Sequence, residues 1–197
     1  QGRGLSLNTE GLKFVDADGL AWPGGNFSFN YREPLGGDKG GGTLGGERLD
    51  LAALNKIAAR LPLPPSVHER LRQHPVTGLV DSLDARWDGP LEAPLDWRVR
   101  GRLSGLAVAA LPAPDDAKGK EVPGIPGLRG AAIDADFGPA GGQASVNIQD
   151  GALSFPGVFE QPEIELADLS ATARWRMDGE RIALTVADLR LRNADAI

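Results

Sequence analysis

The stretch LDWRVRGRLS, residues 95–104, alternates apolar and polar side chains more regularly than any other part of the sequence. Trp97, Val99 and Leu103 fall on one side, and three arginines fall on the other. A period of two is typical of a β-strand that buries one face and exposes the other. The stretch therefore predicts a long strand, which we extend to Val108.

The same alternation recurs on both sides of this stretch. It indicates further strands over residues 26–32, 43–49, 79–87, 131–137, 144–149, 152–155, 169–177 and 181–192. Short connections between amphipathic strands favour antiparallel neighbours with one apolar and one polar face. The sequence thus predicts a mainly β protein, in which an antiparallel meander forms an elongated, curved or open sheet.

One segment departs from the β pattern and predicts two short helices near residues 50–74. Asp50 can cap a helix over Leu51–Leu61, and prolines follow it. Ser66 and Glu69 have capping-box spacing for a second helix that ends near His74. We therefore divide the chain into three parts. Residues 1–49 hold N-terminal strands and a mobile Gly-rich loop at 36–46, residues 50–75 form the helical insert, and residues 76–197 form the main sheet with a Pro-rich linker at 112–126.

Composition excludes several classes of function. The net charge of −6 argues against a nucleic-acid module, which needs a basic face. The absence of cysteine excludes disulfides and thiolate sites, and two histidines are too few for the usual histidine-rich metal sites. We find no catalytic, cofactor-binding or metal-binding motif. Arg98, Arg100 and Arg102 fit a solvated sheet face better than a surface for lipid phosphates. The first residue is Gln1, from which we expect a piece of a longer protein.

The remaining candidate for function is the apolar side of the strands. Its large side chains include Trp97, Val99, Leu103, Ile133, Phe137, Val146, Ile148, Phe155, Trp175, Met177, Leu184 and Val186. Periodicity alone favours the closed core of a β-sandwich. The functional alternative is an open sheet whose apolar face binds acyl chains. The alternation of side chains is the same in both cases.

Several motifs, taken in order, resemble one known family. They are GLKF at 11–14, DGLAWPGG at 18–25, LDLAAL at 49–54, PVTG at 75–78, WDGP at 87–90, PGIPGLRG at 123–130, FPGVFEQP at 155–162 and LRLRNAD at 189–195. Their order and spacing resemble the central region of the YhdP family, within the AsmA-like and TamB-like envelope proteins of Gram-negative bacteria. The resemblance covers nearly the whole chain.

The resemblance implies a segment of a long periplasmic bridge whose parent chain is anchored in the inner membrane. In such proteins the strands form a groove of the β-taco type, which carries phospholipid towards the outer membrane. The resemblance gives no catalytic residues and no cofactors, so we expect a non-enzymatic protein whose partners are phospholipid acyl chains. The helical insert is a departure that puts an uninterrupted groove in doubt. A closed module that scaffolds the cell envelope is the alternative, and a hydrolase or carbohydrate-active domain is a weaker third reading.

Overall fold

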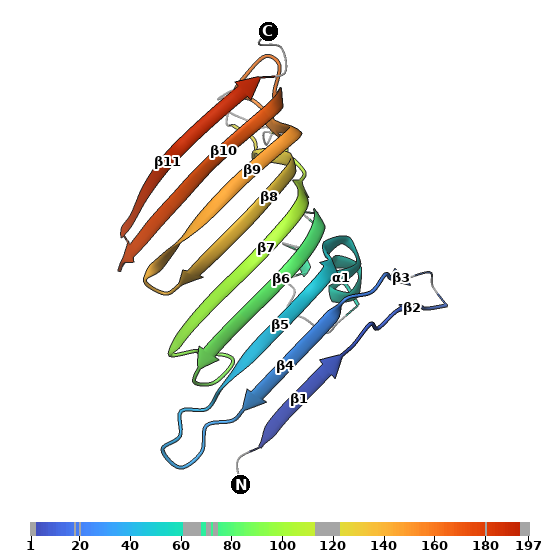
Figure 1. The fold of residues 1–197 in the computed structure, drawn as a ribbon, viewed down its shortest axis with the longest axis vertical. Helices are drawn as coiled ribbons and strands as arrows, with labels where there is room; N and C mark the ends of the chain where they lie inside the picture. Colours follow the sequence, from blue (N-terminus) through green and yellow to red (C-terminus); the bar gives the residue numbers. More distant parts are fainter. Residues whose placement is uncertain are drawn as a thin grey trace, which may run out of the picture.

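The computed structural model describes residues 3–17, 19, 21–60, 68–69, 72, 75–112, 123–179 and 181–193. One nine-stranded antiparallel sheet dominates it, with neighbouring strands in the order β1-β4-β5-β6-β7-β8-β9-β10-β11 (Figure 1). These strands are β1 (Gly4–Thr9), β4 (Asn26–Arg32), β5 (Gly41–Asp50), β6 (Val76–Asp88), β7 (Asp96–Val108), β8 (Gly127–Gly138), β9 (Gly141–Ser154), β10 (Glu163–Asp178) and β11 (Arg181–Asn193).

The predicted open antiparallel sheet is confirmed, and the sandwich that periodicity favoured is wrong for the described residues. The only other described strands, β2 (Phe14–Val15) and β3 (Ala21–Trp22), form a small separate hairpin. The predicted strand from residue 95 to 108 is β7. The two strands predicted at 144–149 and 152–155 are one strand, β9, which ends before Phe155. β5 pairs with β6, so the sheet continues across the helical insert.

The strand predicted at 43–49 is β5, which begins two residues earlier than predicted and so takes in part of the Gly-rich segment. β5 begins at Gly41 and includes Gly42, Gly45 and Gly46. Close packing on both sides of β5 explains its glycines. A Cβ atom at Gly42 would overlap the indole ring of Trp87 on β6, and one at Gly45 would overlap the Ser28 hydroxyl on β4. Glycine therefore allows large side chains to lie flat across β5.

Six consecutive strands, β6 to β11, each contain a β-bulge, a point where the strand has at least one more residue than the strand paired with it. These β-bulges lie at Asp81, Gly105, Gly130, Asp150, Ala167 and Asp188, one in each strand. We call this line of bulges the crease. At Gly105, Gly130, Asp150 and Asp188 the φ angles are 58°, 81°, 49° and 54°. Because a bulge bends its strand and increases the local twist, a line of bulges bends the whole sheet.

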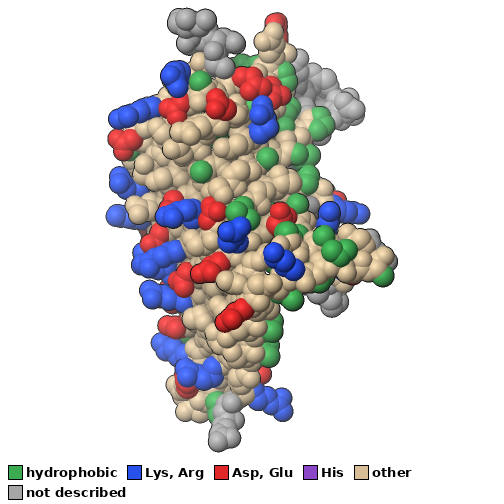
Figure 2. Space-filling model, turned by 45° about the vertical axis from the view of Figure 1, so that its right-hand side comes forward, with side chains coloured by type: hydrophobic (Ala, Val, Ile, Leu, Met, Phe, Trp, Pro, Cys, Tyr) green, Lys and Arg blue, Asp and Glu red, His purple; other side chains and the backbone are tan. Residues whose placement is uncertain are grey.

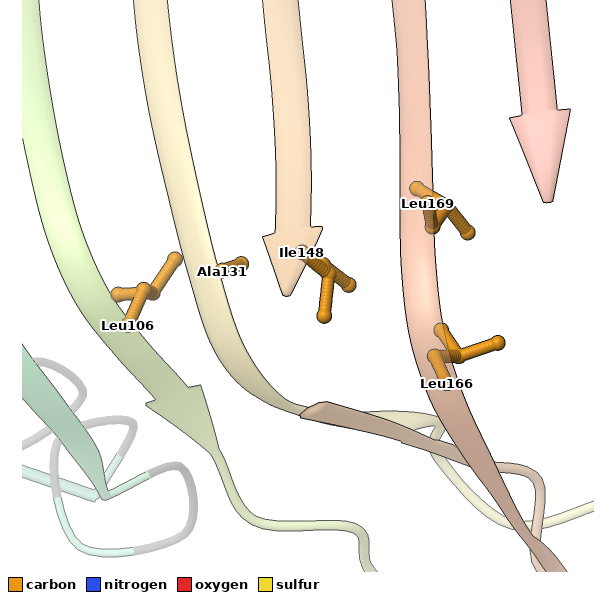
Figure 3. Close-up of a cluster of buried hydrophobic side chains, with 5 residues drawn as sticks. All are labelled: Leu106, Ala131, Ile148, Leu166 and Leu169. Atoms are coloured by element: carbon orange, nitrogen blue, oxygen red, sulfur yellow. The ribbon is translucent and has the colours of Figure 1, made fainter. Parts of the chain in front are cut away.

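The main hydrophobic cluster lies beside the crease. Ala131, Ile148 and Leu166 are at most 1% exposed, and Leu106 and Leu169 complete the cluster. Figure 3 shows the ribbons that carry Leu106, Ala131 and Leu166 curving around these side chains. Because the sheet bends, the side chains on the concave side of the crease bury one another, and among the described residues no second layer of strands covers them.

A second cluster forms where helix α1 (Leu51–Ala58) packs on the sheet. Ala53 of α1 and Trp22 of β3 bury Leu49 and Val80. The helix is shorter than the predicted Leu51–Leu61. Of the second predicted helix, at 66–74, only His68, Glu69 and Arg72 fall among the described residues. Most of the Pro-rich linker at 112–126 likewise lies outside them. The insert thus covers one end of β5 and β6.

The start of α1 follows the predicted capping chemistry. The Asp50 carboxylate accepts a hydrogen bond of 2.7 Å from the backbone N–H of Ala53. Replacing Asp50 with alanine is expected to lower the free energy of unfolding by about 1 kcal/mol, because the first turn loses its cap. Urea denaturation followed by tryptophan fluorescence measures this loss. Asp50→Asn, which keeps an acceptor oxygen, should stay within a few tenths of a kcal/mol of the parent; equal losses in both variants would contradict the capping role.

Candidate functional site

One face of the sheet is apolar across all nine strands, and we call it the apolar face. The strand pairing aligns one row of it without interruption: Leu7, Phe29, Leu44, Ala85, Val99, Phe137, Gly142, Trp175 and Leu184. No polar side chain enters this row. Residues two apart on a strand lie on the same face, so the next rows belong to it as well, and they are mostly apolar, for example Trp87 opposite Trp97 and Ala135 opposite Ala144.

The structure brings eleven of the twelve predicted lipid-contacting residues onto strands β7 to β11. Cross-strand pairs confirm that they share the face, for example Leu103 with Ile133 and Ile133 with Val146. Phe155 is the exception, because it lies in the connection after β9 and contacts Phe159 edge to face at 5.9 Å. Ile148 shares the face but belongs to the buried cluster. Contact with lipid itself remains a prediction for all twelve.

Exposure of the apolar face rises towards the edges of the sheet. Trp97, Val99 and Phe137 on the central strands are half-buried by their neighbours. On β11, Ile182 and Leu184 are 66% and 63% exposed. Among the described residues only α1, β3 and the bend itself bury this face, and all three lie at the crease end. No described residue covers the other half of the face, between the crease and the turns that join β6 to β7, β8 to β9 and β10 to β11.

Sequence reasoning missed the part of the apolar face that lies on β1, β4, β5 and β6. Leu5, Leu7, Phe29, Tyr31, Leu44, Leu83, Ala85 and Trp87 belong to it. The alternation of Phe27, Phe29 and Tyr31 was a visible signal of a strand. What the sequence did not show is that β4 and β5 join the same sheet as β6 to β11.

Aromatic side chains line the apolar face near the hairpin turns. Trp87 lies 5.9 Å from Phe29 and 6.3 Å from Tyr31, while Phe137 lies 5.8 Å from Trp97 and 6.1 Å from Trp175, measured between ring centroids. Pairs at these separations add to the stability gained from burial. The Nε1–H of Trp87 is enclosed and has no acceptor among the described residues. This row forms the boundary between the apolar face and the polar turns.

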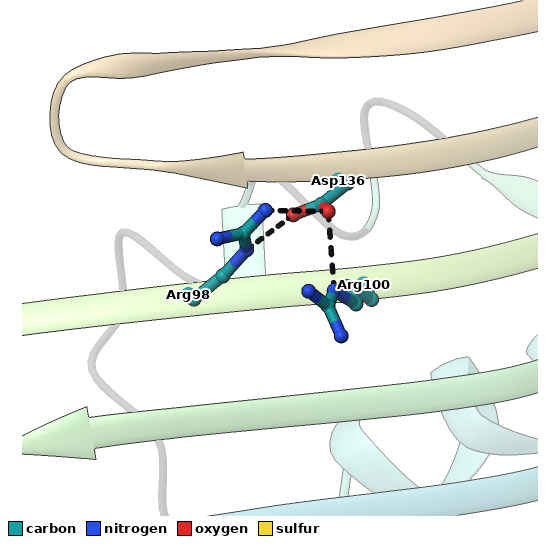
Figure 4. Close-up of polar contacts among 3 residues, drawn as sticks. All are labelled: Arg98, Arg100 and Asp136. Carbon is teal, nitrogen blue, oxygen red and sulfur yellow. Dashed lines mark hydrogen bonds and ion pairs between the residues drawn. The ribbon is translucent and has the colours of Figure 1, made fainter.

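The opposite face is polar and its central charges are paired. Arg98 donates to both carboxylate oxygens of Asp136 at 2.6 and 2.7 Å, and Arg100 donates to the same carboxylate at 3.1 Å (Figure 4). Arg102 pairs with Asp134 at 2.9 Å. A shallow hollow of about 560 Å³ near the turns is lined in part by Arg86, Arg98 and Asp136. The three arginines therefore form a cross-strand ion-pair ladder on a solvated face, as the sequence favoured.

Figure 2 shows basic and acidic side chains mixed along one margin of the molecule, with hydrophobic ones gathered towards the other. In the part of the chain that the structure describes, no group of three or more His, Cys, Asp or Glu side chains is placed to hold a metal ion. Within the same residues, no helix has both the length and the apolar character needed to cross a membrane.

The ion-pair ladder makes the stability of the fold depend on pH in the acidic range. The hydrogen bond from Arg98, followed by that from Arg100, lowers the pKa of Asp136 from its ordinary 3.8 to about 2. A carboxyl with a lowered folded-state pKa stabilises the fold above its unfolded-state pKa and loses this contribution as pH falls through the folded value. The melting temperature of the parent protein should therefore exceed that of Asp136→Asn near neutral pH, and the difference should shrink between about pH 4 and pH 2. Thermal melts across this range test it; a difference that persists undiminished at pH 2 would refute the assignment.

Comparison with known proteins gives one match. The family model described as "YhdP protein" matches residues 1–196. No curated protein matches the chain, and no solved structure matches it.

Proposed function

This chain belongs to the YhdP family of cell-envelope proteins, and from that premise we propose that it is a non-catalytic segment that binds phospholipid acyl chains on its apolar face. In this proposal it acts in the periplasm of a Gram-negative bacterium, as part of a bridge that transfers phospholipid between membranes. The parent chain is anchored in the inner membrane and contributes to the lipid homeostasis of the outer membrane.

The observation that carries the proposal is the uncovered apolar face. Proteins rarely expose a large continuous apolar patch to water. Where such a patch occurs, it marks a site that binds a partner, a ligand or a membrane. Here the patch runs across nine strands, and among the described residues only the small β2–β3 hairpin and α1 pack on it, at one end. A row of small residues, Gly101, Ala135, Ala144 and Ala173, crosses it between larger side chains and leaves room at the surface.

The energetics of acyl-chain binding fit such a face. Each CH₂ group removed from water contributes about 0.8 kcal/mol. The polar head group remains in water at the open side, so no buried ion pair is required. The aromatic row near the turns has amphipathic side chains of the kind found at apolar–polar boundaries. Transfer along such a face needs no nucleophile or metal.

Lipid bound to the purified protein tests the proposal. The protein is purified from membrane-containing extracts, and native mass spectrometry is used to detect bound phospholipid. Delipidated protein is then titrated with a fluorescent fatty acid. We expect co-purified phospholipid and saturable uptake. Absence of both, from a protein whose circular dichroism shows an intact sheet, would refute acyl-chain binding and leave the alternative of a scaffolding module in the envelope.

A further inference from the structure

The β6–β7 hairpin places like charges directly opposite each other on the polar face. Arg86 of β6 pairs in register with Arg98 of β7, and two residues nearer the turn Asp88 pairs with Asp96. The Cβ atoms of directly opposite residues lie about 4.5–5.5 Å apart, and like charges in this position destabilise a sheet. The hairpin therefore ends in two like-charge pairs, one cationic and one anionic.

The protein itself satisfies only part of this charge. Arg98 donates through Nε and Nη2 to Asp136, which leaves the N–H groups of its Nη1. Arg86 and Asp88 make no ion pair with any residue that the structure describes. Asp96 accepts a hydrogen bond of 2.9 Å from the backbone N–H of the residue that follows it, but likewise pairs with no described cation. Both like-charge pairs thus keep capacity for a ligand.

All four residues of these pairs line the hollow of about 560 Å³ near the turns. The hollow continues over Gly138 and Gly141, a register pair beside the β8–β9 turn that carries no side chains. Arg174 of β10 also lines it and has no ion pair in the described part of the chain. Trp97 and Phe137 of the aromatic row border the same hollow. It therefore offers room for a small polar group next to the end of the apolar face.

Opposite charges in neighbouring positions favour a zwitterion over a simple ion. Residues two apart on a strand are about 6.6 Å apart, so the cationic pair and the anionic pair lie side by side. Phosphate oxygens accept charge-assisted hydrogen bonds from guanidinium groups, and an ammonium group donates to carboxylates. A phosphate alone would also meet the two aspartates, and an ammonium alone would meet the arginines. A ligand that carries both groups on a short link satisfies both pairs at once.

We propose that this hollow binds a phosphoethanolamine group, with the phosphate at Arg86 and Arg98 and the ammonium at Asp88 and Asp96. Two sources can supply this group, namely free phosphoethanolamine and the head group of a phospholipid. The second source rests on the proposed function, because the acyl chains of that lipid lie on the apolar face beside the aromatic row. The charges of the site are the same for both sources.

Calorimetric titration of this chain with free phosphoethanolamine tests the site. We expect saturable binding that salt weakens, and weaker binding of inorganic phosphate and of ethanolamine, because each of these satisfies only one of the two pairs. No binding of phosphoethanolamine, or binding of inorganic phosphate that is equally tight, would overturn the proposal.

A short-chain lipid distinguishes the two sources. Dihexanoyl phosphatidylethanolamine is titrated below its micellar concentration. Binding roughly tenfold or more tighter than that of phosphoethanolamine supports a lipid head group, because the acyl chains then leave water as well. Binding no tighter than that of phosphoethanolamine supports the free compound. Dihexanoyl phosphatidylglycerol, which has the same chains and phosphate but no ammonium, should bind more weakly than the ethanolamine lipid; equal binding of the two lipids would count against the anionic pair.

Matched variants locate the site. Arg86→Gln and Asp88→Asn should each weaken phosphoethanolamine binding about twofold to fivefold, the effect of one exposed charge pair. Both variants remove a like-charge repulsion, so circular dichroism should show the parent fold. Lys56→Gln, an exposed change on α1 at the crease end, should leave the affinity unchanged. Uptake of a fluorescent fatty acid should be the same in all three, which separates failure of this site from failure of acyl-chain binding. Unchanged phosphoethanolamine affinity in both hairpin variants would sink the assignment.

Discussion

Deletion of Ser104 together with Gly105 is expected to unfold the protein or to lower its free energy of unfolding by more than about 5 kcal/mol, a large share of the 5–15 kcal/mol typical of a domain. Gly105 is the bulge residue of β7, with a φ angle of 58° and an exposed position. Leu103 and Leu106 share a face because the bulge places two residues between them, so removing both Ser104 and Gly105 makes them neighbours and turns every residue of β7 beyond this point to the opposite face. Leu106, 7% exposed in the main cluster, would point to the polar face, and Val108 would follow it. Each such loss from a core costs about 2–5 kcal/mol.

Substitutions at Gly105 are the control for this deletion. A Cβ atom there would meet no atom within 4 Å, so only the positive φ angle limits the choice of residue. Asp150 and Asp188 occupy the corresponding bulges of β9 and β11 with φ angles of 49° and 54°. Gly105→Asn should therefore cost only about 1 kcal/mol, because asparagine tolerates this conformation. Urea denaturation followed by circular dichroism compares the two proteins; equal stability of the deletion and of Gly105→Asn would show that the bulge does not set the face of β7.

The crease explains which parts of the fold the sequence predicts. The alternation of apolar and polar side chains within a strand involves only residues close in sequence. For this reason the sequence predicts β7 and the strands after it close to their observed positions. At the crease the alternation slips by one residue. Leu103 and Leu106 share a face although they are three apart, and Val186 and Leu189 repeat this pattern. Asp81, which interrupts the pattern in β6, is the bulge residue itself. When the apolar–polar alternation shifts by one residue beside a Gly or Asp in several consecutive strands, the sequence thus indicates a line of β-bulges and a bend in the sheet.

Pairing between distant residues could not be predicted in this way. Whether the apolar face is open or covered depends on what lies against it, and the strands of a sandwich and of a single layer have the same alternation. The partners of the arginine ladder illustrate the same limit. Asp134 and Asp136 alternate on β8 as the arginines do on β7, but the two strands are separated by the Pro-rich segment. Only the register of β7 against β8 turns a basic stripe into ion pairs.

Replacing Val99 with aspartate is expected to weaken the uptake of a fluorescent fatty acid about tenfold or more. Val99 lies on the apolar face between Ala85 and Phe137, in the half that the crease does not bury. A carboxylate at this position would have to lose water when an acyl chain binds over it. That loss costs several kcal/mol unless the group is protonated, and each 1.4 kcal/mol corresponds to a factor of ten in affinity. Val99→Thr, which has nearly the same shape and no charge, should weaken uptake less.

Asn147→Asp is the matched control, since it adds the same charge on the exposed polar face of β9, another central strand. It should leave fatty-acid uptake unchanged. Thermal melts of all variants identify any loss of folding, and Val99→Asp should remain folded because Val99 lies outside both buried clusters. Two outcomes would separate the open face from a closed core. A folded Val99→Asp protein with full uptake would place the lipid elsewhere, and a Val99→Asp protein that fails to fold, while Asn147→Asp folds normally, would mean that this part of the face is covered in solution.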